Sequence, residues 1–497
     1  MDSGNKSLLI RADASTAIGT GHVMRMIALA QAWRDRGGTV TIASCECPEI
    51  LRGRLVDEGI EFSQISAASP GGKDDCVQTA RMAQELSCKW VVLDGYEFHS
   101  DFHLYLRQAS LKVLAVDDYC QNETWAVDAI LNQNISATDF EYRSSVDGCR
   151  FLLGTKYALL RKEFVCPTRS TAKNVTHIQK LLLTLGGGDP DNASGKVLNL
   201  LNQITESNLE IRLLVGATNP NLSALTQIAR EESPHRIEIL RDVRDMPSMY
   251  RWADGVISAA GSTCWEWLNF QLPAAVVVIA ENQVGVANTL ARRGLALHLG
   301  RTEELVNRGR GNVLSKWVSE PKTPSPECVD GYGASRVAAA LADGLWIRSA
   351  SSRDIELYFD WANDPRVRQN ALNSAAIDWD AHTEWFGLRL TSEYSHLFVA
   401  EDILGPVGQV RFDQQDNGCW LVDFSVAAEQ RGKGIGTRML AEAIRRMNAK
   451  GFTTLIATVK QDNPRSMAVF NRLGFTECGE PEDGLVRYRM DGTCVIL

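Results

Sequence analysis

The sequence predicts an α/β protein in which two doubly wound domains are followed by a smaller α+β domain. Short apolar runs alternate with segments of helical periodicity in two successive series, as is typical of parallel sheets covered by helices. From about residue 346 the order changes, because helical segments come first and alternating strands follow. The 497 residues of the chain correspond to about three domains at roughly 150 residues each.

The first series begins with a β-α-β unit near the start of the chain. The predicted strands of the whole series lie at residues 8–11, 39–43, 90–93 and 112–116. The helical pattern between the first two strands includes Val23, Ile27 and Trp33. The polar stretch 166–176 ends this first domain, which we place at residues 1–170.

Two further domains are predicted after this boundary. The second series has strands at residues 180–185, 210–215, 236–240, 255–258 and 274–279. A helical pattern at residues 335–345 closes this second domain, residues 171–345. The third domain, residues 346–497, has strands at 396–401, 407–412 and 420–426, and then a long helix at 436–450.

Composition and charge exclude several classes of protein. Hydrophobic residues make up 44% and charged residues 23% of the chain, which excludes a disordered or fibrous protein. The net charge is -9 without a long Lys/Arg run, so we expect neither nucleic acid nor an anionic membrane as a partner. The apolar run 274–280 is too short to span a bilayer, and residues 1–9 lack a signal-peptide core, which favours a cytoplasmic location.

Cysteine and histidine spacing gives no sign of a metal centre. The 12 cysteines are scattered without a CxxC pair, so we expect reduced thiols and no bound metal. His99 and His103 have helical i, i+4 spacing but lack the glutamate of a metalloprotease motif, so we interpret them as surface histidines. The sequence leaves the oligomeric state open.

A glycine-rich turn follows the first predicted strand and opens a helix. Gly19, Thr20 and Gly21 allow close approach of the backbone, and the unpaired N–H groups of the helix start attract phosphate. His22 falls in the first helical turn, where the positive end of the helix dipole disfavours the imidazolium. A neutral His22 could serve as a general base near neutral pH. A role in local packing or hydrogen bonding remains open.

A second turn of this kind lies after a later strand and before a helix. It comprises Ala259-Ala260-Gly261-Ser262-Thr263. Thr263 and Glu266 also have the spacing of a capping box, so a structural role for both remains open. The loop 186–190, in which Pro190 is expected to start a helix, and the segment 94–96 follow other strands. Because the carboxyl ends of parallel strands meet at one edge of a sheet, these loops predict a ligand cleft there.

Five segments of the first two domains together are similar to a known family. They are Ile10-Arg11-Ala12-Asp13-Ala14-Ser15, Ile18-Gly19-Thr20-Gly21-His22-Val23-Met24-Arg25, Leu185-Gly186-Gly187-Gly188-Asp189-Pro190, Ser258-Ala259-Ala260-Gly261-Ser262-Thr263-Cys264-Trp265-Glu266 and Glu281-Asn282-Gln283. Over about residues 8–345 the chain resembles the UDP-2,4-diacetamido-2,4,6-trideoxy-beta-L-altropyranose hydrolases. The resemblance implies a GT-B-like fold and a metal-independent, inverting cleavage of the anomeric C–O bond by water. The products would be UDP and the free diacetamido sugar, on the pathway to the bacterial nonulosonic acid pseudaminic acid.

The resemblance also implies roles for individual residues. His22 would deprotonate the attacking water, and Tyr96 and Asp13 would shape the pocket around it. The residues that would bind UDP are Gly19, Thr20, Gly21, Gly187, Gly261, Ser262, Thr263 and Glu266. The residues that would contact the sugar are Arg25, Asn282 and Gln283.

The third domain contains a glycine-rich turn of its own at residues 430–436. Such a turn gathers backbone N–H groups at a helix start, which suits a pyrophosphate. With Asn463-Pro464-Arg465-Ser466 and the pattern from Phe470 to Phe475, residues 346–490 resemble the GNAT N-acetyltransferases, which implies acetyl-CoA as co-substrate. The residues that would bind it are Val426, Arg431, Gly432, Lys433, Gly434, Ile435, Gly436, Thr437, Asn463, Ser466 and Phe470.

Phe470 departs from the family pattern, because many GNAT members have a tyrosine at this position. A phenyl ring cannot protonate the departing CoA thiolate. Tyr488, Cys478 or water could act as the acid instead. Alternatively, Phe470 only packs against CoA and the thiolate leaves unprotonated.

Two more segments resemble the sugar-nucleotide N-acetyltransferases that precede the hydrolase in the same pathway. They are Trp361-Ala362-Asn363-Asp364-Pro365-Arg366-Val367-Arg368 and the group of His382, Trp385 and Phe386. A structural interpretation is also open, in which Trp361 and Trp385 belong to the core and Asp364-Pro365 ends a helix.

We therefore expect a bifunctional enzyme. It would N-acetylate UDP-4-amino-4,6-dideoxy-N-acetyl-beta-L-altrosamine with acetyl-CoA and then hydrolyse the acetylated UDP-sugar. One alternative is a GT-B-type UDP-sugar glycosyltransferase with an acetyltransferase tail. In another, the third domain is a non-catalytic module that binds CoA or a sugar.

Overall fold

The computed structural model describes residues 7–491 except residues 16–18, 166–174, 187, 206–207, 217–218, 242, 308, 325–328, 343, 403, 450 and 453. The described residues form three β-sheets. Contacts divide the chain into two compact units, which we call the larger unit (Ser3–Ala338) and the smaller unit (Ala339–Leu497). Two parallel sheets lie in the larger unit and a mixed sheet in the smaller one, which confirms the predicted fold class.

The first sheet of the larger unit is parallel, with the strand order β3-β2-β1-β4-β5-β6-β7. Its strands are β1 Ser7–Ala12, β2 Thr39–Ser44, β3 Glu61–Gln64, β4 Trp90–Asp94, β5 Lys112–Val116, β6 Ala129–Asn132 and β7 Arg150–Leu153. Its helices and 3-10 turns are α1 Gly21–Asp35, α2 Glu49–Asp57, α3 Lys73–Glu85, α4 Ser100–Gln108, η1 Ala137–Asp139, η2 Thr155–Tyr157 and η3 Lys162–Phe164. The strand order reverses between β1 and β4, and ligands of open α/β sheets bind at such a switch point.

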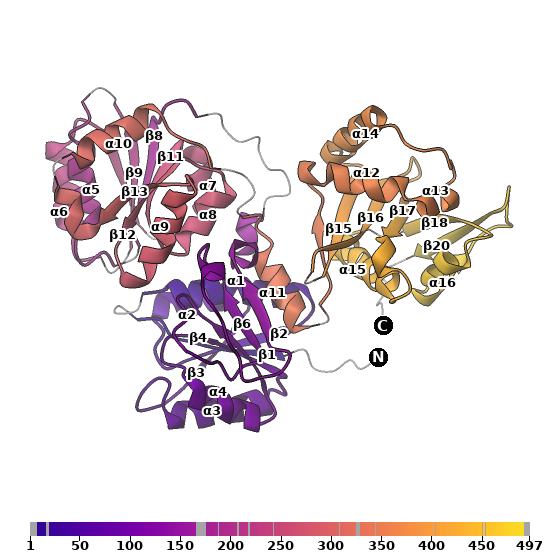
Figure 1. The fold of residues 1–497 in the computed structure, drawn as a ribbon, viewed down its shortest axis with the longest axis horizontal. Helices are drawn as coiled ribbons and strands as arrows, with labels where there is room; N and C mark the ends of the chain where they lie inside the picture. The colour runs from indigo at the N-terminus through magenta and orange to yellow at the C-terminus, as the bar shows by residue number, and fades with distance from the viewer. Residues whose placement is uncertain are drawn as a thin grey trace. The chain divides into compact units, whose positions relative to one another are not determined.

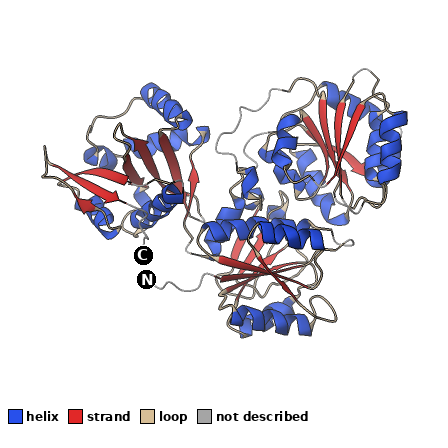
Figure 2. Ribbon diagram, turned by 180° about the vertical axis from the view of Figure 1, so that it is seen from behind, coloured by secondary structure: helices blue, strands red, loops and turns tan. Residues whose placement is uncertain are grey.

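The second sheet has the order β10-β9-β8-β11-β12-β13 and is also parallel. Its strands are β8 Lys180–Thr184, β9 Glu210–Val215, β10 Arg236–Arg241, β11 Gly255–Ala259, β12 Ala274–Val278 and β13 Leu297–Arg301. The helical elements are α5 Ala193–Leu201, α6 Leu222–Gln227, η4 Ile228–Glu232, α7 Met246–Trp252, α8 Thr263–Asn269, η5 Glu281–Gln283, α9 Val284–Arg292, η6 Thr302–Val306, α10 Arg310–Ser319 and α11 Gly333–Leu341. Helices cover both faces of this sheet (Figures 1 and 2), and its switch point lies between β8 and β11.

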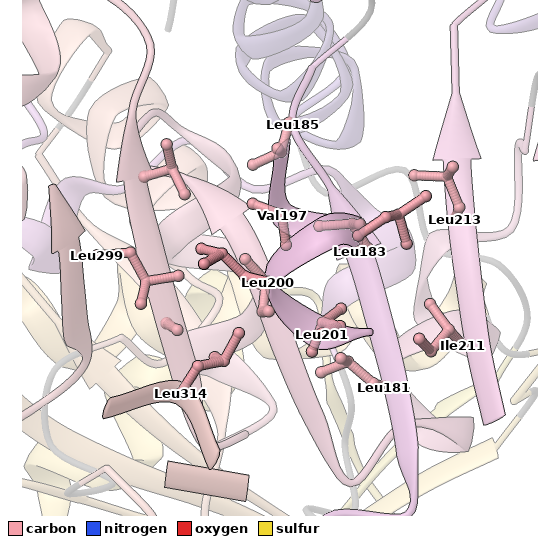
Figure 3. Close-up of a cluster of buried hydrophobic side chains, with 14 of the residues drawn as sticks. Leu181, Leu183, Leu185, Val197, Leu200, Leu201, Ile211, Leu213, Leu299 and Leu314 are labelled. Carbon is pink, nitrogen blue, oxygen red and sulfur yellow. The ribbon is translucent and has the colours of Figure 1, made fainter. Parts of the chain in front are cut away.

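Burial on both faces explains the apolar runs of the second sheet. Leu181, Leu182 and Leu183 of β8 are all fully buried although successive side chains point to opposite faces. Figure 3 shows Val197 and Leu201 of α5 beside Leu181 and Leu183. A central parallel strand of this kind must be apolar at every position, and this is why the sequence made it easy to predict.

Two details of the sequence prediction are wrong. Helix α5 begins at Ala193 and not at Pro190, because Asn192 is the N-cap residue and accepts from the N–H of Gly195, while the Asp189 carboxylate accepts from the N–H groups of Ala193 and Ser194. His103 is a core residue and not a surface histidine, with its ring stacked 5.7 Å from that of Trp125. Burial lowers the pKa of His103 to about 4, so its imidazole is neutral near neutral pH.

The sheet of the smaller unit has the order β14-β15-β16-β17-β18-β20-β19. Its strands are β14 Trp346–Ser349, β15 Ser395–Glu401, β16 Pro406–Gln414, β17 Trp420–Val426, β18 Thr454–Lys460, β19 Thr476–Glu477 and β20 Leu485–Asp491. The helical elements are η7 Ser352–Asp354, α12 Ile355–Asn363, α13 Pro365–Asn370, α14 Trp379–Thr391, η8 Ala428–Gln430, α15 Ile435–Ala449 and α16 Pro464–Arg472. Every helix in the described part of the chain is too short or too polar to cross a membrane.

Strands β17 and β18 are parallel but pair over only part of their length. Their pairing joins Trp420 to Leu455 and Leu421 to Ile456, whereas β17 continues to Val426 beside its other neighbour, β16. The two strands therefore diverge after their first residues, and the β18 side of β17 is left without a ladder partner towards Val426. This divergence adjoins the glycine-rich turn that follows β17.

Helix α11 packs against residues 156–158, which follow the last strand of the first sheet. A Cβ atom on Gly333 would lie 2.2 Å from the carbonyl oxygen of Ala158. Three residues later, Arg336 Nη1 donates to the carbonyl oxygen of Lys156 at 2.8 Å. The close approach at Gly333 thus requires a residue without a side chain.

We predict that Gly333→Ala lowers the unfolding free energy of the larger unit by about 2 kcal/mol or more, because the added methyl group overlaps backbone atoms. The control is Gly53→Ala in α2, where a Cβ atom meets open space. This control should raise stability by about 0.5–1 kcal/mol through helix propensity. Thermal unfolding of the two variants measures the difference, and equal midpoints would contradict the prediction.

Candidate active sites

The glycine-rich turn after β1 leads into α1, with Thr20 as the N-cap residue. Gly19 has a φ of +78°, a left-handed conformation that glycine adopts without strain. Gly19, Thr20 and Gly21 are all exposed, and a Cβ atom at either glycine would meet open space. The Gly19 N–H donates to the carbonyl oxygen of Ser15 at 2.8 Å, and the turn places exposed residues at the carboxyl end of β1 and His22 in the first turn of α1.

His22 forms a hydrogen-bonded pair with Asp94, the last residue of β4. The distance between His22 Nδ1 and Asp94 Oδ1 is 2.6 Å. Burial opposes ionisation of Asp94, but Arg25 and His22 outweigh it and lower the pKa of Asp94 to about 2. An ionised carboxylate can only accept, so Nδ1 of His22 carries the hydrogen and Nε2 is left with a free lone pair in the neutral ring.

The pKa of His22 shifts in the direction opposite to the one predicted from the helix dipole. Burial disfavours the charged imidazolium, but the charge of Asp94 and its hydrogen bond to His22 have the larger combined effect. The pKa of His22 is therefore raised above its ordinary value. His22 is a stronger base than the sequence predicted, and it is available as a base at pH values above its raised pKa.

Arg25 lies between two buried carboxylates. Its Nε donates to Asp94 Oδ2 at 2.7 Å, and its Nη1 donates to Asp118 Oδ1 at 2.9 Å. The Arg25 side chain is 8% exposed, so both acids hold it inside the protein. The sugar contact predicted for Arg25 stays a prediction; within the protein, Arg25 contacts these two acids, and its Nη2 lies 3.3 Å from His22 Nδ1.

Tyr96 connects this cluster to the second sheet. Its ring meets the His22 ring edge-on, with the centroids 5.3 Å apart. The hydroxyl donates to Asp118 Oδ2 at 2.9 Å and accepts from Asn282 Nδ2 at 2.8 Å. Asn282 belongs to η5, which follows β12, so the structure brings together three predicted residues: His22, Tyr96 and Asn282.

Asp13 has a different environment from His22. Its carboxylate accepts from Arg11 at 2.7 Å and from the backbone N–H groups of Cys45 and Glu46 at 2.7 and 3.0 Å. Among the described residues no hydrogen bond joins Asp13 to His22. The contacts of Asp13 anchor the loop after β2.

The turn after β11 contains the predicted residues Gly261, Ser262 and Thr263. Ser262 is the N-cap residue of α8 and makes no side-chain capping bond, so the capping box predicted for Thr263 and Glu266 is wrong. Glu266 instead accepts from the Tyr250 hydroxyl at 2.9 Å and pairs with Arg161 at 3.5 Å. Burial raises the pKa of Glu266, with Arg161 acting in the opposite direction.

Gln283 lies beside the turn after β11. Its Oε1 accepts from the N–H of Ile279 at 3.1 Å, and a Cβ atom on Gly261 would lie 3.6 Å from its Nε2. The structure thus brings the segment Asn282–Gln283 next to this turn. Gly187 lies outside the described residues, and its neighbour Gly186 has a φ of +91°.

In the smaller unit, the glycine-rich turn joins β17 to α15. Gly432 and Gly434 have φ values of +81° and +75° and are exposed. A Cβ atom on Gly436 would lie 3.3 Å from Phe424 and Val426, so glycine lets the start of α15 pack tightly on β17. The turn around Lys433, Ile435 and Thr437 leaves N–H groups of the helix start without intrahelical acceptors.

Arg431 has its side chain engaged within the protein. Its Nε donates to the carbonyl oxygen of Val426 at 3.0 Å, and its Nη2 donates to Asp364 Oδ1 at 2.7 Å. Asp364 lies between α12 and α13 and caps α13 by accepting from the N–H groups of Arg366 and Val367. The Asp364-Pro365 pair therefore ends one helix, starts the next and holds Arg431.

The other predicted CoA residues make local contacts. Asn463 caps α16 by accepting from the N–H of Ser466 at 3.2 Å and also donates to the Ser466 hydroxyl at 3.0 Å. Phe470 is buried, with its ring centroid 5.6 Å from that of Tyr488. The Tyr488 hydroxyl donates to Glu477 at 3.0 Å, and burial followed by this contact raises the pKa of Tyr488.

The aromatic residues of α12 and α14 form a small core. Trp361 and Trp385 pack against the cluster of Tyr358 and Phe386. His382 is buried, and its Nε2 lies 3.0 Å from the carbonyl oxygen of Ile355. These contacts agree with the structural interpretation of the two segments.

Asp94 was predicted only as the end of a strand, and Asp118 was not among the predicted site residues. Asp94 is the last residue of the buried strand β4, and Asp118 lies two residues after the buried strand β5, at the edge where His22 lies. An acid at or just beyond the end of a buried parallel strand is a signal that could have identified both. Among the described residues, no group of three or more His, Cys, Asp or Glu side chains is arranged to hold a metal ion.

Two family models match the chain. Residues 356–475 match the acetyltransferase (GNAT) family, and residues 182–310 match the glycosyltransferase family 28 C-terminal domain. The smaller unit therefore contains a GNAT acetyltransferase domain. The second sheet belongs to a domain related to those of family 28 glycosyltransferases.

Two relatives extend over the larger unit. An uncharacterized protein of Methanocaldococcus jannaschii is 21% identical over 485 residues, which cover 94% of this chain and 96% of that protein. The UDP-2,4-diacetamido-2,4,6-trideoxy-beta-L-altropyranose hydrolase of Campylobacter jejuni is 25% identical over 289 residues, which cover 58% of this chain and 97% of the hydrolase.

Acetyltransferase relatives match 27% of the chain each. The L-methionine sulfoximine/L-methionine sulfone acetyltransferase of Pseudomonas aeruginosa is 29% identical over 141 residues, which cover 81% of that enzyme. The acetyltransferase PseH of Campylobacter jejuni is 28% identical over 139 residues, which cover 83% of it. The matches are consistent with one nucleotide-sugar domain pair and one acetyltransferase domain in a single chain.

The low pKa of Asp94 predicts how the unfolding free energy changes at acidic pH. Its folded-state pKa of about 2 lies below the ordinary value, so the stabilisation is present above about pH 4 and is lost as the pH falls towards 2. This group should contribute about 2 kcal/mol to the loss of unfolding free energy in that interval. Urea unfolding at several pH values should show a weaker acid dependence for Asp94→Asn, and equal dependence in both proteins would refute the assignment.

Proposed function

We propose that this chain N-acetylates UDP-4-amino-4,6-dideoxy-N-acetyl-beta-L-altrosamine with acetyl-CoA and then hydrolyses the acetylated UDP-sugar. The observation that carries the proposal is the His22–Asp94 pair facing Tyr96 and Asn282 at the carboxyl ends of the strands. The match to the Campylobacter jejuni hydrolase over 97% of its length supports the substrate class. The GNAT domain supplies the acetylation that such a substrate requires.

In the hydrolytic step, His22 Nε2 takes a proton from water. The water oxygen attacks the anomeric carbon from the face opposite UDP, and the C–O bond to the β-phosphate breaks with its electron pair going to UDP. Inversion follows from this single displacement. Asp94 stabilises the imidazolium that forms, because it accepts from Nδ1 and is already ionised.

The leaving UDP carries negative charge that the protein must stabilise. The exposed residues Thr20 and Gly21 lie beside His22 at the positive end of α1, where backbone N–H groups would bind the diphosphate, while the Gly19 N–H donates to the Ser15 carbonyl oxygen. The turn of Gly261, Ser262 and Thr263, with Gly187 and Glu266, would hold the rest of UDP. Such donors can stabilise a diphosphate without a metal ion, so the proposed reaction is metal-independent.

In the acetylation step, the divergence of β17 from β18 leaves this side of β17 without a strand partner near Val426, and the pantetheine arm of acetyl-CoA would pair there with backbone groups other than the Val426 carbonyl, which Arg431 occupies. The turn of Gly432 and Gly434 would bind the pyrophosphate through N–H groups, aided by Lys433. The amine of the sugar attacks the thioester carbonyl to form the amide C–N bond, the C–S bond breaks, the thiolate of CoA leaves, and the proton lost by the nitrogen passes to solvent or to the thiolate. Arg431 would act by fixing the Val426 carbonyl, since its side chain is bound there.

The proposal is tested by giving the full-length protein the 4-amino UDP-sugar and following thiol release and UDP release separately. Thiol should appear only with both acetyl-CoA and sugar, and UDP should follow acetylation. The control His22→Ala should keep thiol release while its UDP release falls by about 10²–10⁴-fold, the usual effect of removing a general base.

Two other outcomes would assign different activities to the larger and the smaller unit. UDP release that requires a sugar acceptor instead of water would identify a glycosyltransferase. Thiol release with L-methionine sulfone but not with the UDP-sugar would separate the acetyltransferase from the nucleotide-sugar site. Either result would overturn the bifunctional proposal.

The environment of Tyr488 predicts that it is not the acid for the CoA thiolate. Its hydroxyl is buried, and its proton is donated to Glu477. Tyr488→Phe should therefore retain thiol release within a few-fold, whereas loss of a general acid costs about 10²–10⁴-fold. Steady-state thiol assays of Tyr488→Phe and Cys478→Ser decide this point, and a loss of that size in either variant would identify the acid.

A further inference from the structure

We propose that Asp118 is a positioning residue for the hydrolytic site: its buried carboxylate orients the Tyr96 hydroxyl and offsets the charge of Arg25, which keeps His22 basic. The kinetic consequences rest on the proposed hydrolysis. The effect on His22 concerns the protein alone and can be measured without a substrate.

The contacts of Asp118 leave it without capacity for a substrate. Oδ1 accepts from Arg25 Nη1 at 2.9 Å and from Asn134 Nδ2 at 3.0 Å. Oδ2 accepts from Tyr96 at 2.9 Å and from Arg25 Nη2 at 3.2 Å. A carboxylate has about four acceptor positions, and protein donors occupy all of them. Asp118 therefore acts through its neighbours.

The first effect of Asp118 is on the direction of the Tyr96 hydroxyl. Tyr96 has a single hydroxyl hydrogen, and Asp118 receives it. The Tyr96 oxygen can then only accept hydrogen bonds from other groups, and it accepts one from Asn282. A water held between His22 and Tyr96 would donate one hydrogen to each, which leaves the oxygen lone pairs of the water for the anomeric carbon.

The second effect is on the charge around His22. With a neutral imidazole, Asp94 and Asp118 carry two negative charges, and Arg25 carries one positive charge, in a buried cluster. A proton on His22 balances this cluster. Without Asp118, Arg25 would offset more of the charge of Asp94, so the attraction that favours protonation of His22 would be weaker, although the hydrogen bond to Asp94 remains.

Several groups face His22 from the elements packed around it. They are Arg25 on α1, Asp94 on β4, Tyr96 and Glu97 after β4, and Asp118 after β5. Burial raises the pKa of Glu97, so this acid ionises less readily than the two aspartates. The two aspartates are the anions that balance Arg25.

The test compares Asp118→Asn with Asp117→Asn in the full-length protein. Asp117 is a matched control because it is adjacent and buried, but its carboxylate contacts Tyr142 and the N–H groups of Cys120 and Gln121. The His22 imidazole is titrated by NMR, and its signal is assigned by its loss in His22→Asn. Its titration midpoint should be lower in Asp118→Asn than in the wild type and in Asp117→Asn. The same midpoint in all three proteins would overturn the charge argument.

Kinetics test the orientation of Tyr96. Asp118→Asn should reduce kcat for UDP release by about 10–100-fold, as for other residues that orient a catalytic group, with little change in KM. The acidic limb of its pH profile should move to lower pH. In a Tyr96→Phe background the additional loss should be smaller, because both changes remove the same oriented hydroxyl.

The outcomes separate this inference from the proposed function. Equal kcat losses in Asp118→Asn and Asp117→Asn, with unmoved pH profiles, would mean that Asp118 only stabilises the fold. If the wild type releases no UDP from the sugar, the proposed hydrolysis fails, and the His22 titration still decides the effect of Asp118.

Discussion

The larger unit depends on the contact of one guanidinium with two carboxylates at the carboxyl edge of its first sheet. Asp94 and Asp118 end or follow neighbouring strands, so the topology forces two acids into one buried region. Two carboxylates at such a place are tolerable only with a shared cation, and Arg25 supplies it from α1. The helix that carries His22 also carries this cation, so the strands, the helix and the imidazole are positioned by the same contacts.

The parts of the fold that the sequence predicts well are those in which burial leaves little choice of residue. Strand β8 is apolar at every central position because both of its faces are covered. Strand β3 is short and half exposed, and β6 has only four residues, so neither has a pattern that distinguishes it from a loop. The order of the strands and the pairing of β1 with β4 are set by tertiary packing, and local periodicity cannot predict them.

The site was predictable as a set of residues but not as a set of contacts. The turn at Gly19–Gly21 and the position of His22 follow from local spacing, and the structure has both as expected. His22 and Asp94 are 72 positions apart in the sequence, and Arg25 and Asp94 are 69 positions apart. Local spacing therefore predicts neither contact. Spacing alone suggested a helix dipole as the main influence on His22, whereas a direct carboxylate contact at 2.6 Å is the stronger one.

The hydrogen bond between Tyr96 and Asn282 makes the two sheets of the larger unit interdependent. Tyr96 follows β4 of the first sheet, and Asn282 follows β12 of the second, so neither sheet can orient this pair alone. A ligand that binds only when the pair is formed must, by thermodynamic linkage, also favour the association of the two sheets, and to the same extent. The free energy by which a bound substrate strengthens the association of the two halves therefore equals the free energy by which their association strengthens substrate binding.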